Sequence, residues 1–110
     1  MRNEAKRKKL EAKGWRFGDA QEFLGLSDEE AALIELKLKL AQSLRAVRIK
    51  KGLGQVRVAK ILHSSQSRVA KMEAGDSSVS FDLLVKSHLA LGTSGPELGR
   101  ILIRPLAKAR

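Results

Sequence analysis

The chain has 110 residues, and its 22 Lys and Arg outnumber its 12 Asp and Glu, so the formal net charge of +10 favours a polyanionic partner, most often nucleic acid. Hydrophobic residues make up 43% of the sequence, which is enough for a core and excludes a fully disordered chain. There are no Cys, only two His and no apolar run of about 18 residues, which excludes disulfides, cysteine nucleophiles, a zinc site made by His alone and a membrane-spanning helix.

The first segment, residues 1–16, predicts a basic helix. It carries a net charge of +5, and residues 2–13 are rich in the helix formers Ala, Lys, Arg, Glu and Leu. The basic cluster Lys6–Lys9 is either a solvated helix face or an arm that contacts nucleic acid. Trp15 and Phe17 follow, and we expect them to join a small satellite core, with a binding site as the alternative.

An acidic band follows, because residues 17–36 contain six acids and no base. Asp19 is predicted to cap a short helical turn that ends at Gly25. Ser27 and Glu30 have the spacing of a capping box at the start of the next helix. Since DNA would avoid these carboxylates, the band is the candidate surface for a basic protein partner. Its candidate partner-binding residues are Asp19, Glu22, Asp28, Glu29 and Glu30.

A long helix is predicted from this capping box to about Lys51, where Gly52 ends it. Its apolar residues recur at spacings of three and four, as on helices that pack against a core. They form two adjoining stripes, so we expect contacts on two sides in the first half of the helix. The first stripe contains Leu33, Leu36, Leu40, Leu44 and Val47, and the second contains Ile34, Leu38 and Ala41.

The remaining elements complete an all-α fold, a compact bundle of about five helices with an extra N-terminal helical arm. Two short helices, about Gln55–Leu62 and Ser65–Ala74, are joined by a turn. Two more follow at about Phe81–Leu91 and Pro96–Ile103. The expected domains are a basic helix with an acidic turn (1–28), a helix-turn-helix domain (29–104) and a disordered tail (105–110).

The pair of short helices has the pattern of a helix-turn-helix, with the apolar residues of each helix on one face. It lies in residues 37–72, which contain ten bases and no acid, so we interpret this segment as a polyanion-facing surface rather than a solvated face. We interpret the polar face of the second helix as a surface that reads bases, because Gln can pair with adenine and Arg with guanine. The alternative is that this face is an ordinary polar helix surface. The first turns of the second helix offer Ser65, Gln66, Ser67, Arg68 and Lys71.

Residues 40–92 resemble the lambda-repressor-like, xenobiotic-response-element family of helix-turn-helix proteins. Within that family, three elements are similar to HigA-type antitoxins of toxin–antitoxin operons and their solitary relatives: Ser65–Val69, Val79–Val85 and Ala90–Gly92. The family resemblance itself is carried by Arg48, Gly52, Leu53, Gln55, Ala59, the segment Ser65–Val69, Lys71, Met72, Glu73 and Gly75.

The resemblance implies a role for each matching residue. Gln66, Ser67 and Lys71 would face base edges, with Arg68 at the margin between base and backbone. Ser65 would cap the recognition helix or contact a phosphate. Gln55 would contact a phosphate and also brace Gln66. Arg48 would pair with Glu73 and so support the recognition helix. Further contacts with the DNA backbone would come from Lys51, Arg57 and Lys60.

Two positions depart from the family pattern, and two histidines need an interpretation. His63 stands where the family has Gly, so it must adopt left-handed backbone geometry at some cost, and we read it as a turn residue rather than a ligand. Gly54 replaces a Ser or Thr N-cap. His88 falls on an apolar face, which predicts a buried residue rather than a catalytic base.

The resemblance implies a sequence-specific repressor that binds a palindromic double-stranded DNA operator as a homodimer, for which the last helix is the candidate interface. It further implies an antitoxin that binds a RelE-like toxin and autoregulates its operon. A solitary regulator, or a coactivator-like bridging or RNA-binding protein on the same fold, is the alternative. We expect no enzyme activity, cofactor, metal or membrane partner, and a bacterial cytoplasmic location, nucleoid-associated when bound to the operator.

Overall fold

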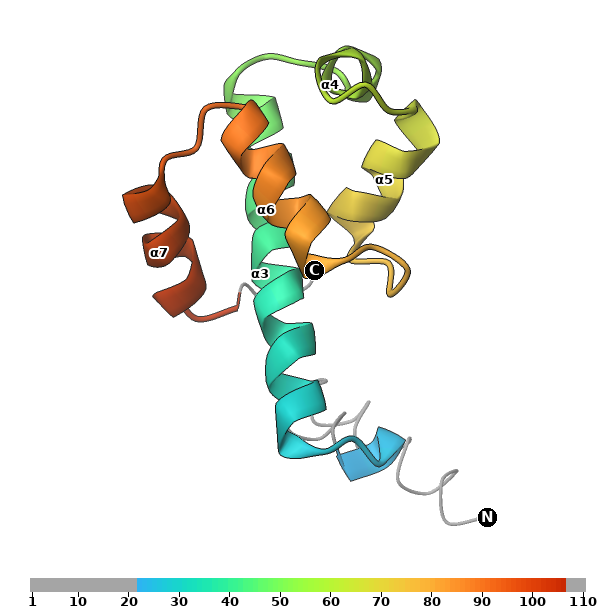
Figure 1. The fold of residues 1–110 in the computed structure, drawn as a ribbon, viewed down its shortest axis with the longest axis vertical. Coiled ribbons are helices and arrows are strands. Elements are labelled where there is room, and N and C mark those ends of the chain that lie inside the picture. Colours follow the sequence, from blue (N-terminus) through green and yellow to red (C-terminus); the bar gives the residue numbers. More distant parts are fainter. Residues whose placement is uncertain (1–21, 107–110) are drawn as a thin grey trace. The chain divides into compact units, whose positions relative to one another are not determined.

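The computed structural model describes residues 22–106, and the chain divides into two compact units, Met1–Glu35 and Leu36–Arg110. The expected all-α class is confirmed, because the regular elements in the described range are helices only (Figure 1). The predictions for residues 1–21, including Trp15, Phe17 and Asp19, and those for residues 107–110 lie outside the described residues. The helices are α3 (Asp28–Lys50), α4 (Gln55–Ile61), α5 (Gln66–Ala74), α6 (Phe81–Ala90) and α7 (Gly95–Ile103).

The start of α3 confirms the predicted capping box. The backbone N–H of Glu30 donates to Ser27 Oγ at 3.1 Å, and the backbone N–H of Ser27 donates to Glu30 Oε1 at 2.9 Å. Before it, Gly25 adopts a φ of +72° and ends the helical residues 22–24. Two backbone donors that lack a helical partner are therefore satisfied by side chains, as the sequence spacing indicates.

The helices predicted within residues 22–106 are present, with shifts of about one residue at their ends. Ser65 is the N-cap of α5 and not its first residue, because its extended backbone leaves its hydroxyl free to accept from Arg68 N–H at 3.2 Å. At the other ends, Leu62 and Leu91 are C-caps of α4 and α6. Lys51 lies in the turn after α3.

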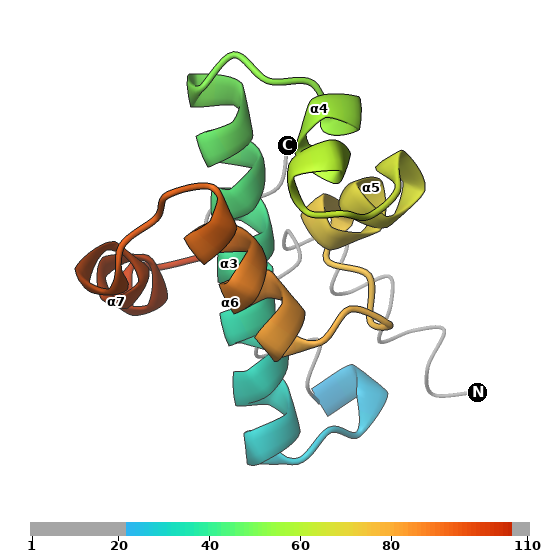
Figure 2. The same cartoon turned by 45° about the horizontal axis from the view of Figure 1, so that its top comes forward.

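Side chains from all five helices and from the loop before α6 form the core of the unit Leu36–Arg110. Figures 1 and 2 show the arrangement of these helices. Leu33, on the first apolar stripe of α3, is 49% exposed, so this stripe is not buried along its whole length. Apolar periodicity continues toward the start of α3, whereas burial depends on a packing partner. The buried core residues are Leu40, Ala41, Leu44, Val58, Ala59, Val69, Met72, Val79, Leu84, Leu91 and Ile101.

His88 of α6 is a fully buried polar residue within this core. Its Nε2 lies 2.9 Å from the Leu40 carbonyl oxygen, and its Nδ1 lies 3.0 Å from Thr93 Oγ1. Because a carbonyl can only accept, Nε2 carries the proton and Nδ1 of the neutral ring accepts from the Thr93 hydroxyl. Burial lowers the pKa of His88, against the opposing effect of the bond to Leu40. The predicted buried histidine is thus confirmed, and it ties α3 to α6 and the following loop.

His63, in the turn between α4 and α5, has the left-handed φ of +54° that its place in the family pattern implies. We expect His63→Gly to raise the free energy of unfolding by about 0.5–1 kcal/mol, because glycine adopts this geometry without a Cβ clash. Urea denaturation monitored by circular dichroism measures the change. The control is Ser64→Gly, since φ at Ser64 is not positive and glycine should there lower stability. Equal or lower stability of His63→Gly would contradict the expected strain.

Candidate nucleic-acid interface

Helices α4 and α5 form a helix-turn-helix in which one face of each helix is buried. Val58 and Ala59 of α4 and Val69 and Met72 of α5 are buried, as the sequence spacing predicts. Gly75 ends α5 with a φ of +73°, and its N–H caps the helix. Because Val69 and Met72 bury one face of α5, the opposite face of this helix points away from the core.

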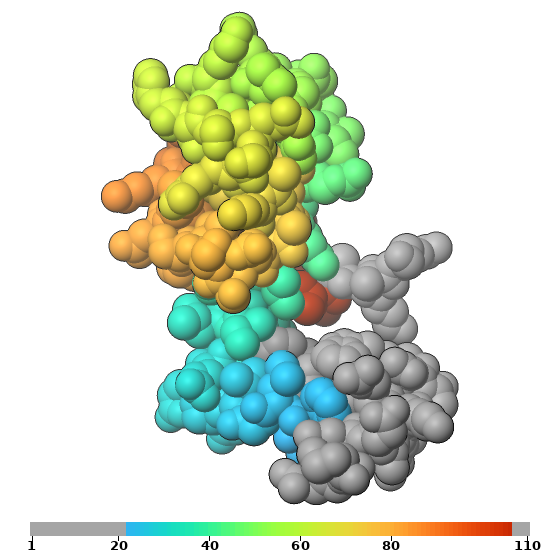
Figure 3. Space-filling model, turned by 90° about the vertical axis from the view of Figure 1, so that its right-hand side faces the viewer, coloured from blue at the N-terminus to red at the C-terminus, as the bar shows by residue number. Residues whose placement is uncertain are grey.

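The outward face of this helix pair is basic. The only acid in α4 and α5 is Glu73, whose side chain is 4% exposed and paired. Figure 3 shows the surface of α4 and α5 in yellow-green and yellow. Since the side chain of Glu73 is buried, the exposed charged residues of these two helices are bases. The predicted site residues exposed on these helices are Arg57, Lys60, Gln66, Ser67, Arg68 and Lys71, and the N-cap Ser65 is exposed beside them.

Helix α5 is held to α3 by an ion pair between Arg48 and Glu73, which confirms the predicted contact. Arg48 Nε lies 2.6 Å from Glu73 Oε2, and Arg48 Nη2 lies 3.1 Å from Glu73 Oε1. Arg48 Nη1 donates to the Leu53 carbonyl at 2.9 Å, so the same guanidinium also holds the loop before α4. The side chain of Arg48 is 14% exposed. The hydrogen bond to Glu73 raises the pKa of Arg48.

Two glutamines continue this network toward the surface. Gln55 Nε2 donates to Glu73 Oε1 at 3.1 Å, and Gln66 Nε2 donates to Gln55 Oε1 at 3.4 Å. The contact expected between Gln55 and Gln66 is therefore present. The bond between Gln55 and Glu73 is not anticipated by the sequence reading. The sequence feature that could have indicated this bond is the seven-residue spacing of Gln66 and Glu73, which places both on one face of α5 two turns apart.

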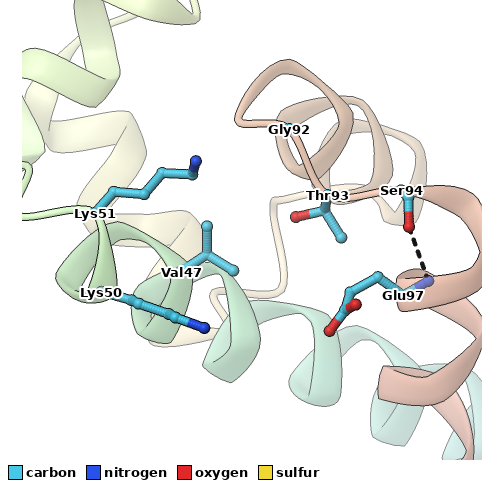
Figure 4. Close-up of a pocket in the computed structure, with 7 residues that line it drawn as sticks. All are labelled: Val47, Lys50, Lys51, Gly92, Thr93, Ser94 and Glu97. Carbon is cyan, nitrogen blue, oxygen red and sulfur yellow. Dashed lines mark hydrogen bonds between the residues drawn. The ribbon is translucent and has the colours of Figure 1, made fainter.

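Lys51 is separated from this network and lines an open hollow of about 410 Å³ (Figure 4). Its Nζ lies beside Gly92, at the end of α6 where the helix carbonyls favour a cation. Lys50 and Glu97 extend into the same hollow, so it has mixed charge. The geometry thus links Arg48, Gln55 and Gln66 through Glu73, while the other predicted contacts lie singly on the surface.

Two further properties of the described residues bear on the class of site. Between residues 22 and 106 there is no group of three or more His, Asp or Glu that could hold a metal ion. None of the helices in the described range is long and apolar enough to cross a membrane.

Comparison with known proteins supports the interpretation of α4 and α5. Residues 44–98, half of the chain, match the family model described as helix-turn-helix (HTH_3). No curated protein and no solved structure matches the chain. The matched segment contains the end of α3, the whole of α4, α5 and α6, and the start of α7. The chain therefore belongs to the lambda-repressor-like helix-turn-helix family and is a DNA-binding transcriptional regulator.

Proposed function

We propose that this regulator is a sequence-specific repressor whose helix α5 enters the major groove of double-stranded DNA. The observation that carries the proposal is the outward face of α4 and α5, where four bases are exposed and no carboxylate is. Gln66, Ser67 and Lys71 would read base edges, with Arg68 at the backbone margin. A basic, polar helix face that projects from a packed core has the charge and the hydrogen-bonding groups that a groove requires.

The remaining site residues are proposed to position the protein on the DNA backbone. Lys60 and Arg57 are exposed on α4, and Lys51 would add a phosphate contact from the turn after α3. The guanidinium of Arg48 is engaged with Glu73 and Leu53, so its proposed role is to hold α5 in place. A homodimer would place two such helices about one turn of DNA apart.

Two single substitutions separate base reading from backbone contact. Gln66→Ala should weaken binding to the preferred site by about 1–3 kcal/mol and relax the preference at one base pair. Lys60→Ala should weaken binding to all sequences equally and lower the salt dependence, the slope of log K against log[salt], by about one. Fluorescence anisotropy with duplexes obtained by selection from a random library, measured over a salt series, checks both. An unchanged base preference in Gln66→Ala would contradict the assignment of α5.

We also propose that the protein is the antitoxin of a type II pair, which binds a RelE-like toxin through its acidic band. The support is charge complementarity between the acidic band and a basic toxin. In the described part of the band, the exposed acids are Glu22, Asp28, Glu29 and Glu30. Asp19 of the band lies outside the described residues. The proposal is tested by co-expressing the chain with a toxin encoded by the adjacent reading frame. If the proposal is correct, the chain restores the growth of cells that express the toxin. Without such a frame, a solitary regulator or a coactivator-like bridging protein is favoured.

A further inference from the structure

The hydrogen bonds between Glu73, Gln55 and Gln66 have a direction that is set at the buried end. The carboxylate oxygens of Glu73 only accept hydrogen bonds, and Oε1 accepts from Gln55 Nε2 at 3.1 Å. If the Gln55 amide were reversed, its oxygen would face that carboxylate oxygen and two acceptors would meet. Gln55 must therefore turn its NH₂ group toward Glu73 and its oxygen toward Gln66.

This orientation decides which groups of Gln66 remain available. Gln55 Oε1 only accepts, so Gln66 approaches it with Nε2, at 3.4 Å. One N–H of Gln66 is then used, and its Oε1 and its second N–H remain for a ligand. The long bond and the exposure of Gln66 allow the amide to move toward DNA while its polarity is retained.

We propose that Glu73 is a positioning residue for base recognition: acting through Gln55, it sets the donor and acceptor ends of the Gln66 amide. This inference rests on the proposed function, in which Gln66 reads a base edge. Adenine presents one acceptor, N7, and one donor, the N6 amino group, to the major groove. The free acceptor and the free donor of Gln66 match this pair, so the network favours adenine.

The reversed amide would admit guanine beside adenine, because the second lone pair of its Oε1 could still accept from the adenine N6 amino group. Gln66 would then accept from residue 55 with Oε1 and keep both N–H groups for the groove. Guanine presents two acceptors, N7 and O6, which match two donors. Discrimination between adenine and guanine therefore depends on a residue that is 4% exposed and is held in place by two hydrogen bonds from Arg48.

The test compares the sequences that the full-length wild type and three variants select from a random duplex DNA library. Gln66→Ala removes the reader and identifies the base pair that it contacts. Gln55→Lys keeps a donor toward Glu73 but can only donate to Gln66, so it should reverse the Gln66 amide and shift that base pair from adenine toward guanine. Glu73→Gln makes either polarity possible, so the enrichment of adenine over guanine there should fall about tenfold while other positions keep theirs.

The position of the change distinguishes positioning from a structural role. A structural defect in Glu73→Gln would weaken all positions together, and the charge added by Gln55→Lys would strengthen all sequences together. Asp82→Asn is the control, because it also removes one carboxylate, at an exposed position in the first turn of α6 outside the network, and should select the wild-type sequence.

Two outcomes would overturn the inference without touching the proposed function. In the first, the adenine preference is lost in Gln66→Ala but fully retained in Gln55→Lys. In the second, Glu73→Gln weakens the sequence preference evenly at all positions of the DNA site. If the wild type selects no sequence at all, the proposed function itself fails. Gln55→Lys retains the ion pair of Arg48 and Glu73, so it keeps the test decisive even if Glu73→Gln proves unstable.

Discussion

Glu73→Gln should lower the free energy of unfolding by about 2 kcal/mol, because it leaves the guanidinium of Arg48 largely buried without its countercharge. The Arg48–Glu73 pair joins α3 to α5, and its side chains are 14% and 4% exposed. The substitution preserves the shape of residue 73, so the loss reflects the charge and one hydrogen-bond acceptor. Urea denaturation of the full-length protein at neutral pH measures it.

The chain contains a matched control for this prediction. Glu97 pairs with Arg100 at 2.7 Å, and these side chains are 45% and 56% exposed. Water and salt screen such a pair, so Glu97→Gln should leave the stability unchanged within experimental error. If both substitutions lowered the free energy of unfolding by the same amount, burial would not make the Arg48–Glu73 pair more stabilising than the exposed Glu97–Arg100 pair.

His88 should make the protein less stable in mild acid. Burial lowers the pKa of His88 in the folded state below its usual value of about 6.5, whereas the unfolded chain titrates near that value. Just below pH 6.5 the unfolded state therefore binds more protons than the folded state. The free energy of unfolding then falls as the pH decreases, by up to about 1.4 kcal/mol for each pH unit until the folded-state pKa is reached. Above pH 6.5 this contribution is fully present.

Two histidine variants test the assignment of this pH dependence. His88→Gln has no titrating ring, so it should lose the slope below about pH 6.5. It should also lower stability at pH 7 by about 1–3 kcal/mol, because core contacts and the bond with Thr93 are lost. His63→Asn changes the exposed histidine and tolerates its left-handed backbone, so it should keep the slope. Stability curves of the two variants from pH 5 to pH 8 that coincide in slope would rule out His88 as the source.

Much of the fold follows from local features of the sequence. The capping box of Ser27 and Glu30, the caps Ser65 and Gly75, and the spacing of Val69 and Met72 each involve residues within a few positions of one another. Their geometry is therefore decided by the helix itself. The same holds for His63, whose left-handed backbone follows from its place in the helix-turn-helix turn.

The sequence by itself determined the helical class of the described residues, the ends of α3 to α7 to within about one residue, the helix-turn-helix and the basic character of its surface. Only the tertiary structure decided which of the apolar residues of α3 are buried, which carbonyl accepts from His88, and how Glu73 directs the glutamines. These features depend on atoms that are far apart in the chain, such as Leu40 and His88, or Gln55 and Glu73. Helical periodicity describes the face on which a side chain lies, but a partner is defined only when two helices pack.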